Sequence, residues 1–353
     1  MRSTLWSLVA LAAFALPATA QDVVRVGDAE IRFGGRLHIQ YEQGSALDAE
    51  PGRVFARRAR LKAEVRWGDA FEARLQPDFA GGEPELEDAW VALRPWPALR
   101  VSMGQFNRTL EVFELASSND LPIIERDARV GGGPSCAGID GVCSLSNLLG
   151  ELDFVGRDQG LRVEWDLGDG LVVSSTLTNG PGANRADENR AKSLSVRTEF
   201  SPRDGLAVGV FYGLHDYLVD AESSDPDTRY AEAIGVDVVA GTWRDGPRFQ
   251  GGFAWGDNWR AGEDARFRGV HLLGSWYLPL RGEGVFAALE PLLRLGWADG
   301  EVGAEGPGRG FVVTPGVAAY VQGRNRVALN LDVVDPTVGA VRWSLKLQSY
   351  AVF

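Results

Sequence analysis

The stretch VRWSLKLQSYAVF, residues 341–353, decides the fold because it alternates two kinds of side chain along a full strand. Successive side chains of an extended chain point to opposite faces, so Trp343 and Leu347 share one face and Lys346 lies on the other. Lipid-compatible side chains on one face and charges on the opposite face are unusual in a soluble core. They are typical of a wall between lipid and water.

The first twenty residues have the features of a secretory signal. Arg2 precedes an apolar run at residues 5–16, and residues 17–20 supply a small-residue cleavage site. The run is too short to span a bilayer as a helix, which needs about 20 residues. We therefore expect residues 1–20 to be a signal peptide and residues 21–353 to form an outer-membrane β-barrel. The aromatic Phe353 at the other end looks like the assembly signal of such barrels.

The overall composition hides this membrane pattern. The chain is 45% hydrophobic and 24% charged, and no apolar run after the signal is long enough for a transmembrane helix. Barrels fall in this range because every second residue of a strand faces water. The 44 glycines and 11 tryptophans fit tight turns, close strand packing and interfacial aromatic girdles. The net charge of −12 argues against nucleic acid as a partner.

Alternation with a period of two recurs along the whole chain and predicts sixteen strands. The connections between them alternate between short, turn-rich segments and mostly longer ones, as the periplasmic turns and external loops of a barrel do. We therefore predict a closed, sixteen-stranded antiparallel transmembrane β-barrel with a water-filled lumen. The predicted strands are residues 31–41, 55–67, 71–79, 86–94, 98–106, 160–167, 171–179, 193–200, 206–215, 231–243, 249–257, 267–278, 284–297, 310–321, 326–334 and 340–353.

The third external connection, residues 107–159, is far longer than any other. Loops of this length are usually functional or disordered, and the first half of this one is too apolar for a solvated tail. We expect it to fold into the lumen and form a constriction. Its later part holds Cys136 and Cys143, for which we favour a disulfide over a metal site because the compartment is oxidising and no histidine is near.

Several short motifs stand out in the first half of the chain: GQF at residues 104–106, FELASSNDLPIIER at 113–126, FARRARL at 55–61 and GRDQG at 156–160. Together they resemble the phosphate- and pyrophosphate-selective porins, the porin O and P family. The resemblance also includes DAW at residues 88–90 and is strongest over residues 30–165.

The family resemblance implies a homotrimeric barrel in which arginines lead small anions to a central site. Guanidinium groups match phosphate oxygens in bidentate geometry, hydroxyls add neutral donors, and successive weak sites let an ion both enter and leave. Lys62 joins the set because it shares one strand face with two of the arginines. The candidate residues for the anion path are Arg36, Arg58, Arg60, Lys62, Asp88, Ser117, Ser118 and Arg126.

The chain departs from the family pattern at Glu114, which stands where phosphate-selective members have a lysine. Residues 107–159 carry nine acidic against four basic side chains. The inward faces of the first five strands are nevertheless rich in arginine, so we predict an anion-favouring channel with only a modest preference for phosphate.

We expect the remaining partners to be membrane lipid, lipopolysaccharide and the barrel-assembly machinery, with no cofactor and no metal. Two other functions stay open, a general diffusion porin without phosphate preference and a non-conducting structural barrel. An enzyme is a further class, since some outer-membrane barrels are lipases or proteases. The chain carries no HExxH, GxSxG or Walker motif to favour it.

Overall fold

A computed structural model describes residues 23–45, 52–130, 136–219, 227–282, 284–303, 308–336 and 339–353. The predicted signal peptide at residues 1–20 lies outside these ranges. None of the described helices is both long and apolar enough to cross a membrane.

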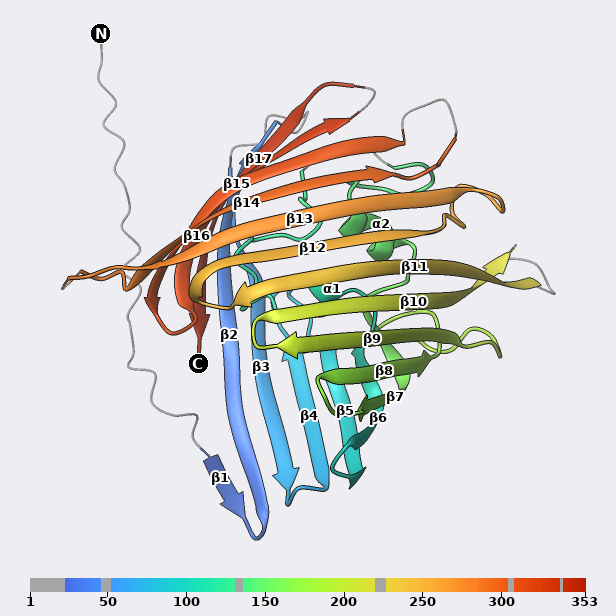
Figure 1. Ribbon diagram of the computed structural model, residues 1–353, viewed down its shortest axis with the longest axis vertical. Coiled ribbons are helices and arrows are strands. Elements are labelled where there is room, and N and C mark those ends of the chain that lie inside the picture. The colour runs from blue at the N-terminus through green and yellow to red at the C-terminus, as the bar shows by residue number, and fades with distance from the viewer. Residues whose placement is uncertain are drawn as a thin grey trace.

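The described strands form one antiparallel sheet that closes into a barrel of sixteen strands, β2 to β17, each paired with its neighbours along the chain (Figure 1). This confirms the predicted fold class. The strands are β2 (Ala29–Gly44), β3 (Arg53–Trp67), β4 (Phe71–Asp78), β5 (Glu85–Trp96), β6 (Leu99–Asn107), β7 (Arg157–Asp166), β8 (Leu171–Thr178), β9 (Ser193–Arg203), β10 (Leu206–Val219), β11 (Asp227–Thr242), β12 (Asp245–Asp257), β13 (Arg266–Pro279), β14 (Ala288–Asp299), β15 (Arg309–Gln322), β16 (Asn325–Pro336) and β17 (Arg342–Val352).

The barrel closes where the last strand, β17, pairs with the first barrel strand, β2. Phe353 follows β17 directly and exchanges two backbone hydrogen bonds with Gly35, of 2.9 and 3.2 Å. A Cβ atom at position 35 would lie 2.6 Å from the Phe353 ring, so only glycine allows this approach without a shift. The pairing leaves no open strand edge at the seam, as a hydrocarbon environment requires.

One short strand that the alternation did not predict, β1 (Val23–Val26), pairs with the start of β2. Val23 lies opposite Arg32, three positions before Gly35 along β2. The other side of β2 is occupied by β3, so β1 continues the line of β17 along the seam.

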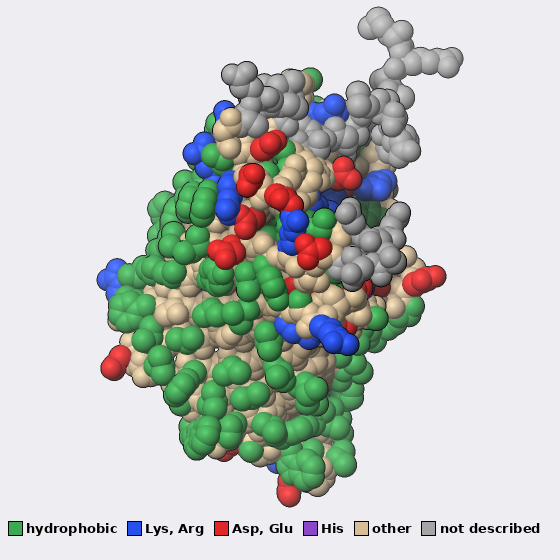
Figure 2. Space-filling model, turned by 90° about the vertical axis from the view of Figure 1, so that its right-hand side faces the viewer, with side chains coloured by type: hydrophobic (Ala, Val, Ile, Leu, Met, Phe, Trp, Pro, Cys, Tyr) green, Lys and Arg blue, Asp and Glu red, His purple; other side chains and the backbone are tan. Residues whose placement is uncertain are grey.

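Side chains alternate between the two faces of the wall. In β17, Ser344, Lys346 and Gln348 are buried, whereas Trp343 and Leu347 are exposed on the outer surface. Figure 2 shows hydrophobic side chains spread over the outer wall, with charged groups gathered toward one end of the molecule. This is the lipid-facing and lumen-facing division that the sequence predicted.

Among the register shifts of the described strands, the two in β3 and β5 change which side chains reach the lumen. In β3 the register passes from Arg58 to Ala56, which leaves Arg57 as an extra residue. In β5 it passes from Asp88 to Leu86, which leaves Glu87 as an extra residue. A bulge re-aims the side chain that it inserts. Strict alternation would place Arg57 and Glu87 on the lipid face, but both form ion pairs with lumen side chains.

The connection between β6 and β7, residues 108–156, is called L3 below. It contains α1 (Val112–Leu115), capped by the Glu111 side chain, and α2 (Leu145–Glu151), capped by Ser144. Figure 1 places both helices within the ring of strands, and both contact strands among β12, β13 and β14. Apolar L3 side chains pack onto lumen-facing side chains of these and neighbouring strands, for example Phe113, Leu121 and Ile123 against Leu273 and Leu292.

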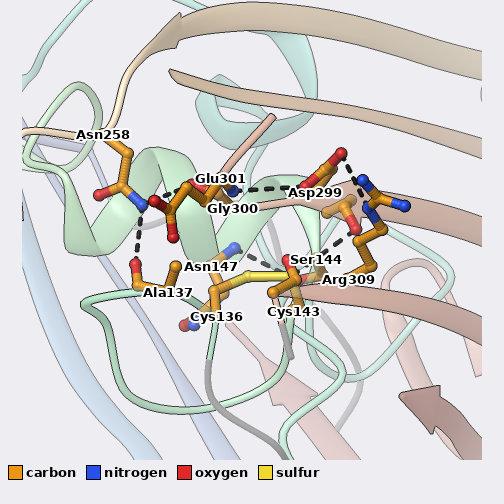
Figure 3. The surroundings of a disulfide bond; sticks show 12 residues. Cys136, Ala137, Cys143, Ser144, Asn147, Asn258, Asp299, Gly300, Glu301 and Arg309 are labelled. Atoms are coloured by element: carbon orange, nitrogen blue, oxygen red, sulfur yellow. Dashed lines mark hydrogen bonds and ion pairs between the residues drawn. A yellow bond between two sulfur atoms is a disulfide. The ribbon is translucent and has the colours of Figure 1, made fainter. Parts of the chain in front are cut away.

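The later part of L3 is closed by the predicted Cys136–Cys143 disulfide, which is confirmed. Figure 3 shows it beside the loops that follow β12 and β14. The Asn258 side chain donates to the carbonyls of Ala137 (2.7 Å) and Gly300 (2.6 Å), so it ties the disulfide-closed turn to both loops.

Candidate functional site

A cavity of about 510 Å³ lies between L3 and the wall formed by β2 to β5 and β7. It collects candidate residues that are far apart in the sequence. Of the predicted path residues, Lys62 alone does not line it. Those that do are Arg36, Arg58, Arg60, Asp88, Ser117, Ser118 and Arg126, together with the predicted modifier Glu114. We call this space the central cavity.

Arg36 faces L3 across the central cavity. Its Nη1 atom donates to the hydroxyl of Ser118 at 2.9 Å and lies 3.4 Å from that of Ser117. On the barrel wall, Arg36 stands directly opposite Arg60, although like charges in this position destabilise a sheet. No described carboxylate lies within 4.0 Å of the Arg36 guanidinium, so its charge is not neutralised by an ion pair.

Among the described arginines that line the central cavity, Arg58 is the second without a carboxylate partner. It is 8% exposed, and its Nη1 atom is buried without a hydrogen-bond partner. It lies opposite His38, whose Nε2 atom is 3.0 Å from the Oδ1 atom of Asn119 in L3. A buried donor without a partner is costly, so Arg58 would gain from binding an anion. Arg58 and Arg36 are the two cavity-lining wall cations that no described carboxylate neutralises.

Other basic side chains of this wall are tied into a lattice of ion pairs. Arg60 pairs with Asp78 at 2.6 Å and also with Glu87, and Arg157 pairs with Glu87 and, at 2.8 Å, with Asp88. Lys62 pairs with Glu64 at 2.8 Å, outside the central cavity.

Glu114 lies on α1, where its carboxylate accepts a hydrogen bond of 2.5 Å from Ser146. Arg126 is 4.0 Å from Glu114 and donates to the carbonyls of Phe113 (2.8 Å) and Ala116. Burial raises the pKa of Glu114 even though Arg126 acts in the opposite direction. Arg126 therefore has two contacts: it holds backbone carbonyls of α1 and of the residue that follows it, and it lines the central cavity.

Sequence reasoning missed Arg57, which the β3 bulge turns toward L3. It binds Glu125 through two hydrogen bonds, of 2.6 and 3.1 Å. Burial alone would raise the pKa of Glu125, but the Arg57 hydrogen bonds and charge outweigh it and lower the pKa to about 2. The only signal for this contact in the sequence is the pair of adjacent arginines, which does not reveal a bulge.

Cations of β14, β16 and β17, on the other side of the seam from β2, hold the backbone of L3. Arg326 donates to the carbonyls of Asn119 and Leu121, at 2.6 Å each. Arg294 and Lys346 donate to carbonyls of residues 125, 126 and 129, at 3.0, 2.5 and 2.5 Å respectively. These cations of β14, β16 and β17 therefore fix the loop, whereas Arg36 of β2 and Arg58 of β3 line the central cavity.

One tryptophan, Trp90, lies outside the expected girdle and packs with Ala92 and Phe106 inside the barrel. Trp90 points into the lumen, where the guanidinium carbons of Arg100, Arg74 and Arg162 lie 4.6, 5.3 and 5.9 Å from its ring centroid. They surround a second cavity of about 230 Å³ nearer the short turns. Its arginines also pair with Glu64, Glu72 and Glu164, so the ion-pair lattice continues here.

The family model of the phosphate-selective porin O and P matches residues 31–220, more than half of the chain and the part that includes β2 to β10 and L3. The chain belongs to this family. It is therefore an outer-membrane porin, as the motifs of the first strands and L3 predicted.

Solved structures of low sequence identity share the fold. The anion-selective porin from Comamonas acidovorans has a TM-score of 0.63 and 12% identity, over 92% of this chain and 100% of that one. The outer membrane channel DcaP of Acinetobacter baumannii has a TM-score of 0.62 and 12% identity, over 92% and 97%. The trimer form of OmpT from Vibrio cholerae has a TM-score of 0.60 and 11% identity, over 92% and 99%. No curated protein matches the chain in sequence.

Proposed function

We propose that this porin is an anion-favouring channel whose constriction is formed by residues 107–159. The observation that carries the proposal is the pair of wall guanidiniums, Arg36 and Arg58, that have no described carboxylate partner and line the same cavity. Ser117 and Ser118 face them with hydroxyl donors, and Arg126 adds a third cation. An oxyanion passing the loop would exchange part of its hydration shell for these donors.

The preference for phosphate is expected to be modest. Guanidinium groups suit phosphate because they bind two of its oxygens at once. Asp88 and Glu114 line the same cavity and repel a doubly charged anion more strongly than chloride. The Comamonas porin is described as anion-selective, which agrees with the proposal at the level of charge.

We further propose that the chain works as a homotrimer inserted among lipid and lipopolysaccharide, with Phe353 recognised by the barrel-assembly machinery. The trimer form of Vibrio OmpT supports the oligomeric state by analogy. A general diffusion porin remains the second candidate, because most arginines outside the Arg36–Arg58 pair are neutralised by carboxylates. Catalysis has no support among the motifs of the sequence.

Reversal potentials of the purified porin in planar bilayers with a KCl gradient test the proposal. The double variant Arg36→Ala/Arg58→Ala should lower the chloride-to-potassium permeability ratio by about tenfold, since two unit charges leave the cavity wall. Arg94→Ala is the matched control, because Arg94 pairs with Glu72 at 3.5 Å and does not line the central cavity. A cation-selective wild-type pore would refute an anion-binding site at Arg36 and Arg58. Equal effects of the double variant and of Arg94→Ala would also refute it.

A further inference from the structure

The β5 bulge brings two successive carboxylates, Glu87 and Asp88, to the lumen side of the same strand. A regular strand would send one of them to the lipid face. Each carboxylate then binds a different set of arginines, and the two sets share Arg157. The bulge therefore adds one negative charge beside the central cavity.

Glu87 lies between two cavity-lining arginines and binds both of them. Its Oε1 atom pairs with Nη2 of Arg60, and its Oε2 atom pairs with Nη1 of Arg157. Both arginines have a second carboxylate of their own, Asp78 for Arg60 at 2.6 Å and Asp88 for Arg157 at 2.8 Å. Glu87 is thus a third carboxylate on two arginines that each keep one carboxylate without it.

We infer that Glu87 is a specificity-determining residue, which confines strong anion binding to the Arg36–Arg58 pair because it adds a negative charge beside Arg60 and Arg157 and occupies a guanidinium nitrogen of each. Without its charge, Arg60, directly opposite Arg36 on the next strand, and Arg157 would each keep one carboxylate, but the guanidinium nitrogens that now bind Glu87 would be free for an anion. A longer run of free guanidinium donors holds a divalent anion more tightly and releases it more slowly. This inference rests on the proposed anion path and adds a residue that acts through Arg60 and Arg157.

The replacement Glu87→Gln removes the charge and keeps the shape and one acceptor oxygen. A unit charge roughly 8 Å away, at a dielectric constant between that of a protein surface and that of water, changes the binding energy of a monovalent ion by about 1 kcal/mol. This changes the affinity of the ion site about fivefold. We expect the chloride-to-potassium permeability ratio to rise by about this factor. Block of chloride current by inorganic phosphate should occur at about fivefold lower phosphate concentration.

The matched control is Glu72→Gln, the same change on the same wall. Glu72 pairs with Arg66, Arg94 and Arg100, none of which lines the central cavity. It should leave phosphate block unchanged. Equal phosphate block in wild type and Glu87→Gln would overturn the inference.

A second pair of variants keeps the test decisive if Glu87→Gln fails to insert. Arg157→Gln and Glu87→Gln/Arg157→Gln differ only in the Glu87 charge, and the double variant leaves no unpaired cation at position 157. The double variant should bind phosphate about fivefold more tightly than Arg157→Gln, and equal binding would overturn the inference. If the wild-type pore is cation-selective, the proposed function fails. If it is anion-selective and insensitive to the Glu87 charge, only the role of Glu87 fails.

Discussion

Replacing Arg326 by methionine tests how strongly the barrel wall holds L3. The Arg326 side chain is 1% exposed, and its guanidinium lies 3.9 Å from the centre of the Tyr350 ring. Methionine keeps the apolar stem of this side chain but removes both 2.6 Å hydrogen bonds to the carbonyls of Asn119 and Leu121. The two carbonyls follow directly after Ser117 and Ser118, which contact Arg36.

The expected loss follows from these two contacts. A hydrogen bond from a charged donor contributes about 1.5–3 kcal/mol, so two such bonds contribute about 3–5 kcal/mol after allowance for partial compensation by water. At 1.4 kcal/mol per tenfold change, the population of displaced L3 conformations should rise roughly a hundredfold or more. Single-channel recordings should show larger and noisier openings, and phosphate block should weaken because the serine hydroxyls leave Arg36.

Arg324→Met provides the matched control. Arg324 also contacts L3, through Asp120 at 3.0 Å, but both side chains are partly exposed. Exposed pairs contribute only about 0–1 kcal/mol, so this variant should conduct like the wild type. Equal behaviour of the Arg326 and Arg324 variants, or wild-type conductance in Arg326→Met, would refute the view that carbonyl contacts position the loop.

Three further predictions concern L3 and the cavity. Replacing Cys136 and Cys143 by serine should lower the stability of the loop by about 2–3 kcal/mol, seen as earlier proteolysis of L3 in the inserted porin, whereas proteolysis unchanged from wild type would argue against this role. The pKa of Glu125 is depressed to about 2, so the Arg57–Glu125 contact stabilises the fold above the ordinary carboxyl pKa of about 4.3 and is lost as the pH falls toward 2. Wild-type current noise should therefore rise across that window, whereas Arg57→Gln should show such noise already at neutral pH; a wild-type record without pH dependence would contradict this. Glu114→Lys should strengthen phosphate block and Lys62→Ala should leave it unchanged, because Glu114 lines the central cavity and Lys62 does not. A larger change in phosphate block from Lys62→Ala than from Glu114→Lys would show that phosphate does not bind in the central cavity.

Period-two alternation predicted which face of each strand meets lipid, because that property depends only on the chain itself. Trp343 and Lys346 lie on the faces that the pattern assigned. The same rule failed at Arg57 and Glu87, because a bulge is set by the register with the neighbouring strand. Ser117, Ser118 and Arg126 were proposed through the family resemblance, and the structure places them together with Arg36 and Arg58.

Ion-pair partners were the least predictable part of the site. Arg58, Arg60 and Lys62 look equivalent in the sequence because they share one face of one strand. The structure separates them, since Arg60 meets Asp78 and Lys62 meets Glu64, whereas Arg58 meets no described carboxylate. Glu64 lies on β3 with Lys62, but the partners of Arg60 come from β4 and β5, about which alternation within β3 carries no information.

The seam brings the end of the last strand close to the start of β1. Phe353 pairs with Gly35 and Val23 pairs with Arg32, so the end of the last strand and the start of β1 are separated by about two residues, or roughly 10 Å, along one side of β2. A linker of two or three small residues would span this gap and join Phe353 to Val23. The last strand and β1 would then form one continuous strand beside β2. The barrel is therefore suited to circular permutation, with new termini placed in an external loop such as residues 258–265, and the order in which its strands are synthesised becomes an experimental variable.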